Sequence, residues 1–261
     1  MSWIKNFTVY LSVVFCLNLS LWAQESRLLT KEHVVNEIRR TPDCFTQGLV
    51  YSEKRFYESC GLYGKSKWRV VDETWKILKE QSLEPKHFAE GLVKVGDELI
   101  QLTWQNPRIL VWDEKKKNLK RDLPFPLKEG WGLAKAPEGY WVTDGSEYLT
   151  LLDESFQIIK RVPVVLNGKN IQKLNELEFA KGLLLVNVWQ TGNVLVVEPH
   201  SGAVLEIWNL DRIWADVFQK NPQVDVLNGI AWDAGKQRLW VTGKLWPSVF
   251  EIKVRNSVIW N

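Results

Sequence analysis

Histidine and cysteine are scarce in this sequence, and the motifs that depend on them are missing. The 261 residues include only His33, His87 and His200, and no two of these have the spacing of a metal site. No Gly-x-Ser-x-Gly turn and no glycine-rich phosphate loop occur. The sequence therefore lacks the motifs of histidine-ligated zinc enzymes, of hydrolases with a nucleophile elbow and of nucleotide-binding domains.

An excess of charge of either sign is also absent. The 34 lysines and arginines nearly balance the 31 aspartates and glutamates, which leaves a net charge of +3. Nucleic acids and acidic membrane surfaces attract strongly basic proteins. We therefore expect no nucleic-acid partner.

The longest uncharged apolar run stands at the N-terminus. Residues 7–22 follow a short segment with one lysine and end before the small residue Ala23. The run is too short and too polar for a membrane span, but its pattern is typical of a secretory signal. We predict that residues 1–23 are a signal peptide, that 24–261 form one domain, and that the protein is secreted or periplasmic. No stable membrane insertion is expected after cleavage.

Removal of that segment leaves two cysteines, Cys44 and Cys60, on either side of a predicted hairpin. In an exported protein such a pair could form a disulfide. Two free thiols fit the sequence equally well, because the sequence does not fix the distance between the Cα atoms.

Tryptophan, by contrast, is abundant, with 15 residues. Large aromatic side chains dominate core packing, so some of these must fill the interior. A chain with so many can also use several to line a binding pocket.

A short pattern built on glycine recurs along the chain at intervals of about 40–50 residues. Four copies are QGLV at 47–50, EGLV at 90–93, WGLA at 131–134 and NGIA at 228–231, with a divergent copy, ELEF, at 176–179. Each copy is followed by two runs of apolar and β-branched residues bounded by Gly, Pro, Asn or Asp, as in strands and turns. Five such units predict an all-β fold, a five-bladed β-propeller of four-stranded antiparallel blades.

The two ends of the chain predict how the ring closes. The last unit has only three strands, and residues 33–38, before the first unit, form an additional strand. We expect this strand to complete the last blade and to cover its edge. Ile213, Trp214 and Val217 have helical spacing and predict one short inserted helix over 211–218.

Residues beside the repeated glycines should gather at one rim of the ring. Because neighbouring strands are antiparallel, the start of each first strand and the end of each second strand share an edge. The side chains at these slots are polar or aromatic and differ from blade to blade, which favours a functional site. They are Gln47, Glu90, Trp131, Asn175, Glu176 and Asn228 at the first strands, and Trp104, Asp144, Trp189, Gln190 and Lys244 at the second.

Stretches around these slots carry a family resemblance. The longest are DVLNGIAWD at 225–233 and VTGKLWP at 241–247, and shorter ones are FTQGL at 45–49, FAEGL at 88–92, GWGLA at 130–134, LNELE at 174–178 and NVWQT at 187–191. With these stretches, the sequence from about residue 34 to residue 253 resembles the glutaminyl-peptide cyclotransferases of the plant and bacterial β-propeller type.

The resemblance implies a reaction and a set of site residues. An N-terminal glutamine would be closed to pyroglutamate with loss of ammonia, without a metal or another cofactor, and the enzyme would act on peptides or proteins. Separately, we expect a monomer. Glu90 matches the family's acid/base glutamate. The other candidate catalytic residues are Gln47, Asn175 and Lys244, and the candidate substrate-binding residues are Phe45, Phe88, Trp104, Trp131 and Trp189. Cys44 and Cys60 depart from the family, which would have a small residue and threonine there.

These residue types suit the chemistry. The tryptophans would hold the glutamine folded, so that its α-amine reaches its own carboxamide. Glu90 would accept a proton from the amine and return it to the departing ammonia. Lys244, Gln47 and Asn175 are candidates to bind the carboxamide oxygen as negative charge develops on it.

Several alternatives remain open from sequence alone. Glu90 could be a buried structural carboxylate paired with Lys244. Glu90, Asn175, Glu176 and Asn228 could converge on Ca²⁺ in a metal-dependent hydrolase or lactonase. The ring could also be a non-catalytic extracellular binding module. We expect a second group of tryptophans to pack between blades, namely Trp68, Trp112, Trp141, Trp208, Trp232 and Trp240, and we leave Trp246 unassigned.

Overall fold

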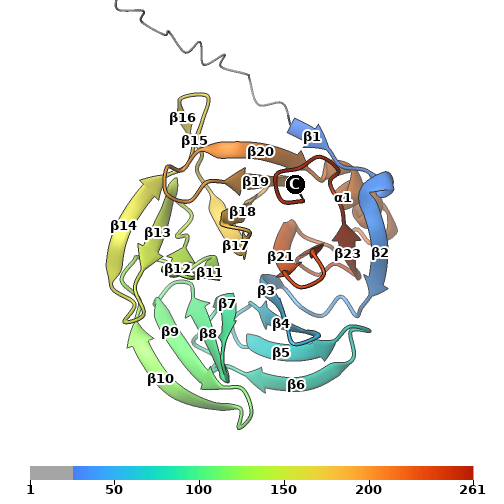
Figure 1. The fold of residues 1–261 in the computed structure, drawn as a ribbon. Helices are drawn as coiled ribbons and strands as arrows, with labels where there is room; N and C mark the ends of the chain where they lie inside the picture. The colour runs from blue at the N-terminus through green and yellow to red at the C-terminus, as the bar shows by residue number, and fades with distance from the viewer. Residues whose placement is uncertain (1–25, 261) are drawn as a thin grey trace, which may run out of the picture.

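The strands form a closed ring of five sheets around a central axis (Figure 1). The computed structural model describes residues 26–260, so the predicted signal peptide at 1–23 lies outside the described residues. In each sheet the first strand lies nearest the axis, and the inner strands of successive blades contact one another. The predicted five-bladed β-propeller is confirmed.

Consecutive antiparallel strands build each blade. The first blade contains β3 (Thr46–Ser52), β4 (Arg55–Cys60), β5 (Lys67–Asp72) and β6 (Ile77–Ser82). The second contains β7 (Ala89–Val95), β8 (Glu98–Thr103), β9 (Arg108–Asp113) and β10 (Asn118–Pro124). The third contains β11 (Leu133–Ala136), β12 (Gly139–Val142), β13 (Tyr148–Leu152) and β14 (Ile158–Pro163). The fourth contains β17 (Leu174–Ala180), β18 (Leu183–Val188), β19 (Asn193–Val197) and β20 (Val204–Asn209).

The fifth blade joins the two ends of the chain. It contains β21 (Leu227–Asp233), β22 (Arg238–Gly243) and β23 (Ser248–Ile252), and its outer strand is β2 (Val34–Arg39), which pairs antiparallel with β23. A 3-10 turn, η1 (Lys31–His33), precedes β2. The predicted closure of the last blade by an N-terminal strand is therefore confirmed.

Three short strands were not predicted. β1 (Ser26–Leu28) pairs parallel with β20 and adds a fifth strand to the outer edge of the fourth blade. β15 (Val165–Leu166) and β16 (Lys169–Asn170) form a small hairpin that protrudes from the ring (Figure 1). Segments of two or three residues are too short for an alternating pattern to be recognised.

The inserted helix is present between the fourth and fifth blades. It is α1 (Asp211–Lys220), and Ile213 and Val217 on its inner face pack in the same apolar cluster as Trp208. Within residues 26–260, no helix combines the length and the apolar character that a bilayer crossing requires. The helix thus contributes packing at a blade junction.

The hydrophobic core lies between adjacent blades. Trp141 of the third blade, for example, shares a cluster with Leu184 of the fourth. The tryptophans expected to pack in this way are all buried, namely Trp68, Trp112, Trp141, Trp208, Trp232 and Trp240. Trp246 is also buried, and its indole Nε1 donates a hydrogen bond to the Asp225 carbonyl at 2.9 Å.

The repeated glycines stand where inner strands meet. A Cβ atom on Gly48 would lie 2.6 Å from the backbone nitrogen of Leu92, and one on Gly132 would lie 2.1 Å from the carbonyl oxygen of Asn175. Neither approach leaves room for a side chain. The glycine pattern that revealed the repeats therefore reflects crowding around the axis.

Cys44 and Cys60 form a disulfide, with their Cα atoms 5.1 Å apart. Of the two alternatives left open by the sequence, the structure contains the bonded pair. The bond joins the segment before β3 to the end of β4.

Candidate active site

β-bulges interrupt the inner strands at the predicted rim positions. The register of β7 on β8 skips from Ala89 to Leu92, so Glu90 and Gly91 leave the regular ladder. The same irregularity falls at Gln47 in β3, at Asn175 and Glu176 in β17, and at Asn228 and Gly229 in β21. A bulge bends its strand and redirects a side chain. This local geometry turns polar groups of different blades toward one mouth of the ring.

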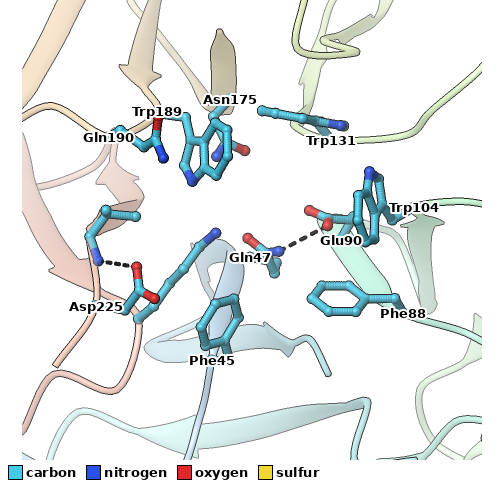
Figure 2. A pocket seen from close by; sticks show the side chains of 12 residues that line it. Phe45, Gln47, Phe88, Glu90, Trp104, Trp131, Asn175, Trp189, Gln190 and Asp225 are labelled. Carbon is cyan, nitrogen blue, oxygen red and sulfur yellow. Dashed lines mark hydrogen bonds between the residues drawn. The ribbon is translucent and has the colours of Figure 1, made fainter. Parts of the chain in front are cut away.

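At that mouth lies a cavity of about 290 Å³. All nine candidate site residues line it: Phe45, Gln47, Phe88, Glu90, Trp104, Trp131, Asn175, Trp189 and Lys244 (Figure 2). Gln190, Asp225 and Val226 complete the lining. Residues as far apart in the sequence as Phe45 and Lys244 thus line the same pocket.

Glu90 is buried in this pocket and is held by a polar chain. Its Oε1 accepts a hydrogen bond of 2.8 Å from Nε2 of Gln47, and Oε1 of Gln47 in turn accepts one of 3.2 Å from Asn228. Burial raises the pKa of the Glu90 carboxyl well above its ordinary value, the positive charge of Lys244 opposes this rise, and the negative charge of Glu129 adds to it.

Lys244 is the buried cation of the pocket. Its Nζ lies 4.7 Å from the centre of the Phe45 ring. Burial lowers the pKa of Lys244, while the charges of Glu90 and Asp225 partly restore it. Within residues 26–260, Lys244 and Glu90 form no ion pair in direct contact, although the charge of each shifts the pKa of the other. The arrangement is therefore not that of a directly paired structural carboxylate.

Aromatic rings surround these polar groups. The rings of Trp131 and Trp189 meet edge to face with centres 5.6 Å apart. The Phe88 ring lies between Phe45, at 6.3 Å, and Trp104, at 5.5 Å. Figure 2 shows these five rings around Gln47 and Glu90. Such walls exclude water and strengthen the electrostatic interactions inside the pocket.

Asn175 lines the pocket and carries a buried side-chain acceptor without a partner within residues 26–260. Its side chain is buried, and its Oδ1 has no hydrogen-bond partner among the described residues. Its backbone carbonyl is fixed by the hydroxyl of Thr143 at 2.7 Å. A buried acceptor without a partner carries a free-energy cost that a bound ligand with an N–H group can remove.

The remaining rim candidates lie outside the pocket. Glu176 accepts a hydrogen bond from the Leu49 backbone N–H at 3.2 Å, and Asn228 donates to the Thr46 carbonyl at 3.0 Å. Neither residue lines the cavity beside Glu90 and Asn175. The four oxygen donors considered for Ca²⁺ are therefore not brought together in this pocket. Asp144 is engaged by Arg161 at 3.3 Å and is likewise outside it.

The profile of the glutamine cyclotransferase family matches residues 9–254, which is most of the chain. This chain belongs to the glutamine cyclotransferase family. A glutaminyl-peptide cyclotransferase of Arabidopsis thaliana is 35% identical over 257 residues, which cover 94% of this chain and 80% of that protein. The crystal structure of Myxococcus xanthus glutaminyl cyclase superposes with a TM-score of 0.77 at 32% identity, over 85% of this chain and 95% of the other. The resemblance inferred from the motifs is confirmed.

Four residues in or beside this pocket had no site role predicted from the sequence. Gln190 was expected at the rim but not in the site, and Asp225 and Val226 lie within a matching stretch without a role. The fourth is Glu129, which accepts hydrogen bonds from the indole groups of Trp104 and Trp131. Glu129 stands two residues before Trp131, at the slot that Phe45 and Phe88 occupy before Gln47 and Glu90, but no role was predicted for a carboxylate there.

Proposed function

We propose that this cyclotransferase converts the N-terminal glutamine of peptides and proteins into pyroglutamate and releases ammonia. The observation that carries the proposal is the buried carboxyl group of Glu90, which has a raised pKa and lies inside a pocket walled by tryptophan and phenylalanine rings. Family membership and the names of the two relatives support the same reaction.

Glu90 acts as the proton carrier. The α-ammonium group of the substrate, with a reference pKa of about 7.7–8.0, gives a proton to the Glu90 carboxylate. The free amine then attacks the γ-carbonyl carbon, and a new C–N bond closes the ring. Glu90 gives this proton to the amide nitrogen, the former C–N bond breaks, and ammonia leaves. The ring nitrogen still carries a second hydrogen, which passes through the regenerated Glu90 carboxylate to the ammonia, so that the products are pyroglutamate and ammonium. The raised pKa of Glu90 brings it closer to that of the amine, which eases transfer in both directions.

Lys244 is the preferred group for the developing oxyanion. Its charge is buried, and it has no ion-pair partner among the described residues. Gln47 already directs its amide N–H to Glu90. Asn175 lines the pocket beside these groups, and its buried Oδ1 has no hydrogen-bond partner among the described residues. Fixed charges in a water-excluded site stabilise a transition state without reorganisation.

The aromatic walls hold the substrate folded. A free glutamine side chain samples many extended shapes, whereas the cyclisation requires the amine and the carboxamide of one residue to meet. Trp104, Trp131 and Trp189 confine the side chain from different blades. Holding reactants in contact geometry can supply a large share of the rate enhancement.

Ammonia release from a peptide that begins with glutamine tests the proposal. Glu90→Gln should lower kcat by about 100-fold or more, since it removes the acid–base group. The circular dichroism spectrum should not change. The matched control is Glu84→Gln, an exposed glutamate that forms an ion pair with Lys86 away from the pocket, and this variant should keep full activity. A peptide with an acetylated N-terminus should release no ammonia. Near-full turnover by Glu90→Gln would disprove the role of Glu90.

Turnover in the presence of a chelator separates this proposal from the metal-dependent alternative. We expect the rate to stay unchanged when EDTA is added, because Glu90, Gln47 and Lys244 supply the acid–base and electrostatic chemistry. If EDTA abolishes the activity and added Ca²⁺ or Zn²⁺ restores it, the metal-free mechanism is wrong. A binding module without catalysis would release no ammonia in either condition.

Export from the cytoplasm is a further part of the proposal. The Cys44–Cys60 disulfide supports it, because disulfides persist mainly in oxidising compartments. Fractionation of cells that express the full chain should place the protein outside the cytoplasm. Retention of the uncleaved chain in the cytoplasm contradicts the export prediction.

A further inference from the structure

Glu129 connects two walls of the pocket through one atom. Its Oε2 accepts hydrogen bonds of 2.8 Å from Nε1 of Trp104 and of 2.8 Å from Nε1 of Trp131. Trp104 follows β8 of the second blade, whereas Trp131 precedes β11 of the third. A single carboxylate oxygen thus fixes two indole rings that come from different blades.

The backbone around Glu129 is itself held in place. A Cβ atom on Gly130 would lie 2.8 Å from the carbonyl oxygen of Thr103, so this segment lies directly against the end of β8. The backbone N–H of Trp131 donates to the Thr143 carbonyl at 3.0 Å. The carboxylate therefore projects from a fixed segment toward the two indoles.

These hydrogen bonds also determine which indole N–H groups remain available to a bound substrate. The N–H groups of Trp104 and Trp131 are both occupied by Glu129. Among the described residues, the third wall, Trp189, has no carboxylate on its indole nitrogen and meets Trp131 only through the ring edge. Glu129 makes Trp104 and Trp131 apolar walls in a fixed orientation.

We propose that Glu129 is a positioning residue of the active site, which fixes the rings of Trp104 and Trp131 for substrate binding and places a negative charge near Glu90. This inference rests on the proposed cyclisation. Hydrogen bonds from neutral N–H groups to a charged carboxylate are stronger than those between neutral groups, so the bridge resists rotation of either ring.

The charge of Glu129 has a second effect, on the proton affinity of Glu90. The charged groups that face Glu90 are Glu129 and Lys244, and Gln47 is its neutral hydrogen-bond donor. The negative charge of Glu129 raises the pKa of Glu90, and the positive charge of Lys244 lowers it. Removal of the Glu129 charge alone should therefore lower the pKa of Glu90.

Two substitutions separate the bridge from the charge. Glu129→Gln keeps an acceptor oxygen but loses the charge, whereas Glu129→Ala loses both. We expect Glu129→Ala to raise KM for a Gln-peptide about tenfold or more, because both indoles lose their acceptor. Glu129→Gln should largely retain the wild-type KM, but the acidic limb of its kcat/KM profile should move to lower pH, because kcat/KM reports the pKa of the free enzyme.

Glu138→Ala is the matched control. Glu138 also accepts an indole hydrogen bond, from Trp141 at 2.9 Å, but it lies outside the pocket. This variant should keep the wild-type KM and pH profile. The inference is overturned if Glu129→Ala keeps the wild-type KM, or if Glu138→Ala changes KM as much as Glu129→Ala does.

The NMR signals of the indole N–H protons provide a readout that does not need activity. Glu129→Ala should shift the signals of Trp104 and Trp131 in the free protein, and Glu138→Ala should shift that of Trp141 instead. If the wild-type protein releases no ammonia, the proposed function fails while these shifts still test the bridge. Unchanged signals of Trp104 and Trp131 in Glu129→Ala refute the positioning role.

Discussion

At the scale of single residues, the pocket couples a carboxyl group with a raised pKa to an ammonium group with a lowered one. Burial is the main cause of both shifts, since it disfavours the charged form of either group. The charge of Lys244 partly offsets the rise in the pKa of Glu90, and the charge of Glu90 partly offsets the fall in the pKa of Lys244. A substitution at either position should therefore change the titration of its neighbour.

Replacement of Lys244 by methionine tests this coupling. The positive charge of Lys244 lowers the pKa of Glu90, so its removal should raise that pKa further. A base with a higher pKa is ionised only at higher pH, and the acidic limb of kcat/KM should move upward in pH. We also expect kcat to fall about 100-fold, as for the loss of one oxyanion group. Rate measurements across pH check both effects.

The shift in Lys244→Met should be opposite in direction to that in Glu129→Gln. The two charges act on Glu90 with opposite sign. Shifts in the same direction in the two variants would contradict the coupling.

Substitution of Trp131 should mainly affect substrate binding, whereas substitution of Trp112 should mainly affect stability. Trp131 lines the cavity, so Trp131→Ala should mainly raise KM. Trp112 is buried against Trp68, with ring centres 6.2 Å apart, and its Nε1 donates to Gln101 at 3.2 Å. Trp112→Ala should cost about 3–5 kcal/mol of stability, because it leaves a cavity in the core. Denaturant unfolding and steady-state kinetics of both variants distinguish the two effects, and equal destabilisation by both would contradict the assignment.

At this scale the sequence predicted most of the pocket residues, but the repeated slots did not show which of their side chains reach the pocket. Gln47, Glu90 and Asn175 all stand beside the inner-strand glycines or their divergent counterpart, and all reach the pocket. Glu176 and Asn228 stand at the same slots but do not line the cavity, because Glu176 accepts from the Leu49 backbone N–H and Asn228 donates to the Thr46 carbonyl and to Gln47. Spacing alone cannot separate these cases, because the direction of a bulged side chain depends on the local twist.

At the scale of elements, the strand pattern of the blades was predictable because apolar and β-branched runs alternate with turn residues. The pairing of β2 with β23 was also predictable, since the last unit lacked a strand. The parallel addition of β1 to β20 was not, because three exposed residues carry no apolar signal. Their pairing depends on an edge that exists only in the folded ring.

The disulfide should act as a stabilising link between two elements beneath the pocket. Cys44 and Cys60 close a loop of 16 residues, for which loop entropy predicts about 3 kcal/mol of stability. The Cys44 carbonyl also accepts a hydrogen bond of 2.9 Å from Leu245, next to Lys244. Reduction with a thiol should therefore lower Tm and weaken substrate binding in the wild-type protein.

The double variant Cys44→Ala/Cys60→Ala is the control for reduction. It should start with a lower Tm and should not respond to the thiol. Thermal unfolding with and without reductant measures both proteins. An unchanged Tm of the wild-type protein after verified reduction would show that the link does not stabilise the fold.

At the scale of the whole molecule, ring closure fixes the relative positions of residues that are distant in sequence. The segment at 44–47 and Lys244 meet because β2 and β23 complete one blade. Closure also removes the exposed edge that a linear array of blades would present. The pocket is thus a product of the closed ring and exists in no single blade.

The predicted signal cleavage has a consequence for the mature chain. Cleavage after Ala23 leaves Gln24 as the first residue. The mature protein would then carry the same group on which the enzyme is proposed to act. We expect mass spectrometry of the exported protein to show an N-terminal peptide lighter by one ammonia, and that of Glu90→Gln to show a predominantly open glutamine. An open Gln24 in the active wild-type protein would contradict this expectation.

The position of β1 determines how that modification would proceed. β1 is the outermost strand of the fourth blade, with β20, β19 and β18 between it and the inner strand β17 (Figure 1). Four strand spacings amount to about 19 Å, whereas two residues before Ser26 extend at most about 7 Å. While β1 stays paired with β20, this span is longer than the reach of two residues, so we expect that one molecule does not bring its own Gln24 into its own pocket. Self-modification should therefore be a reaction between two molecules. Its rate should rise with protein concentration, and added active protein should convert the Gln24 of an inactive variant.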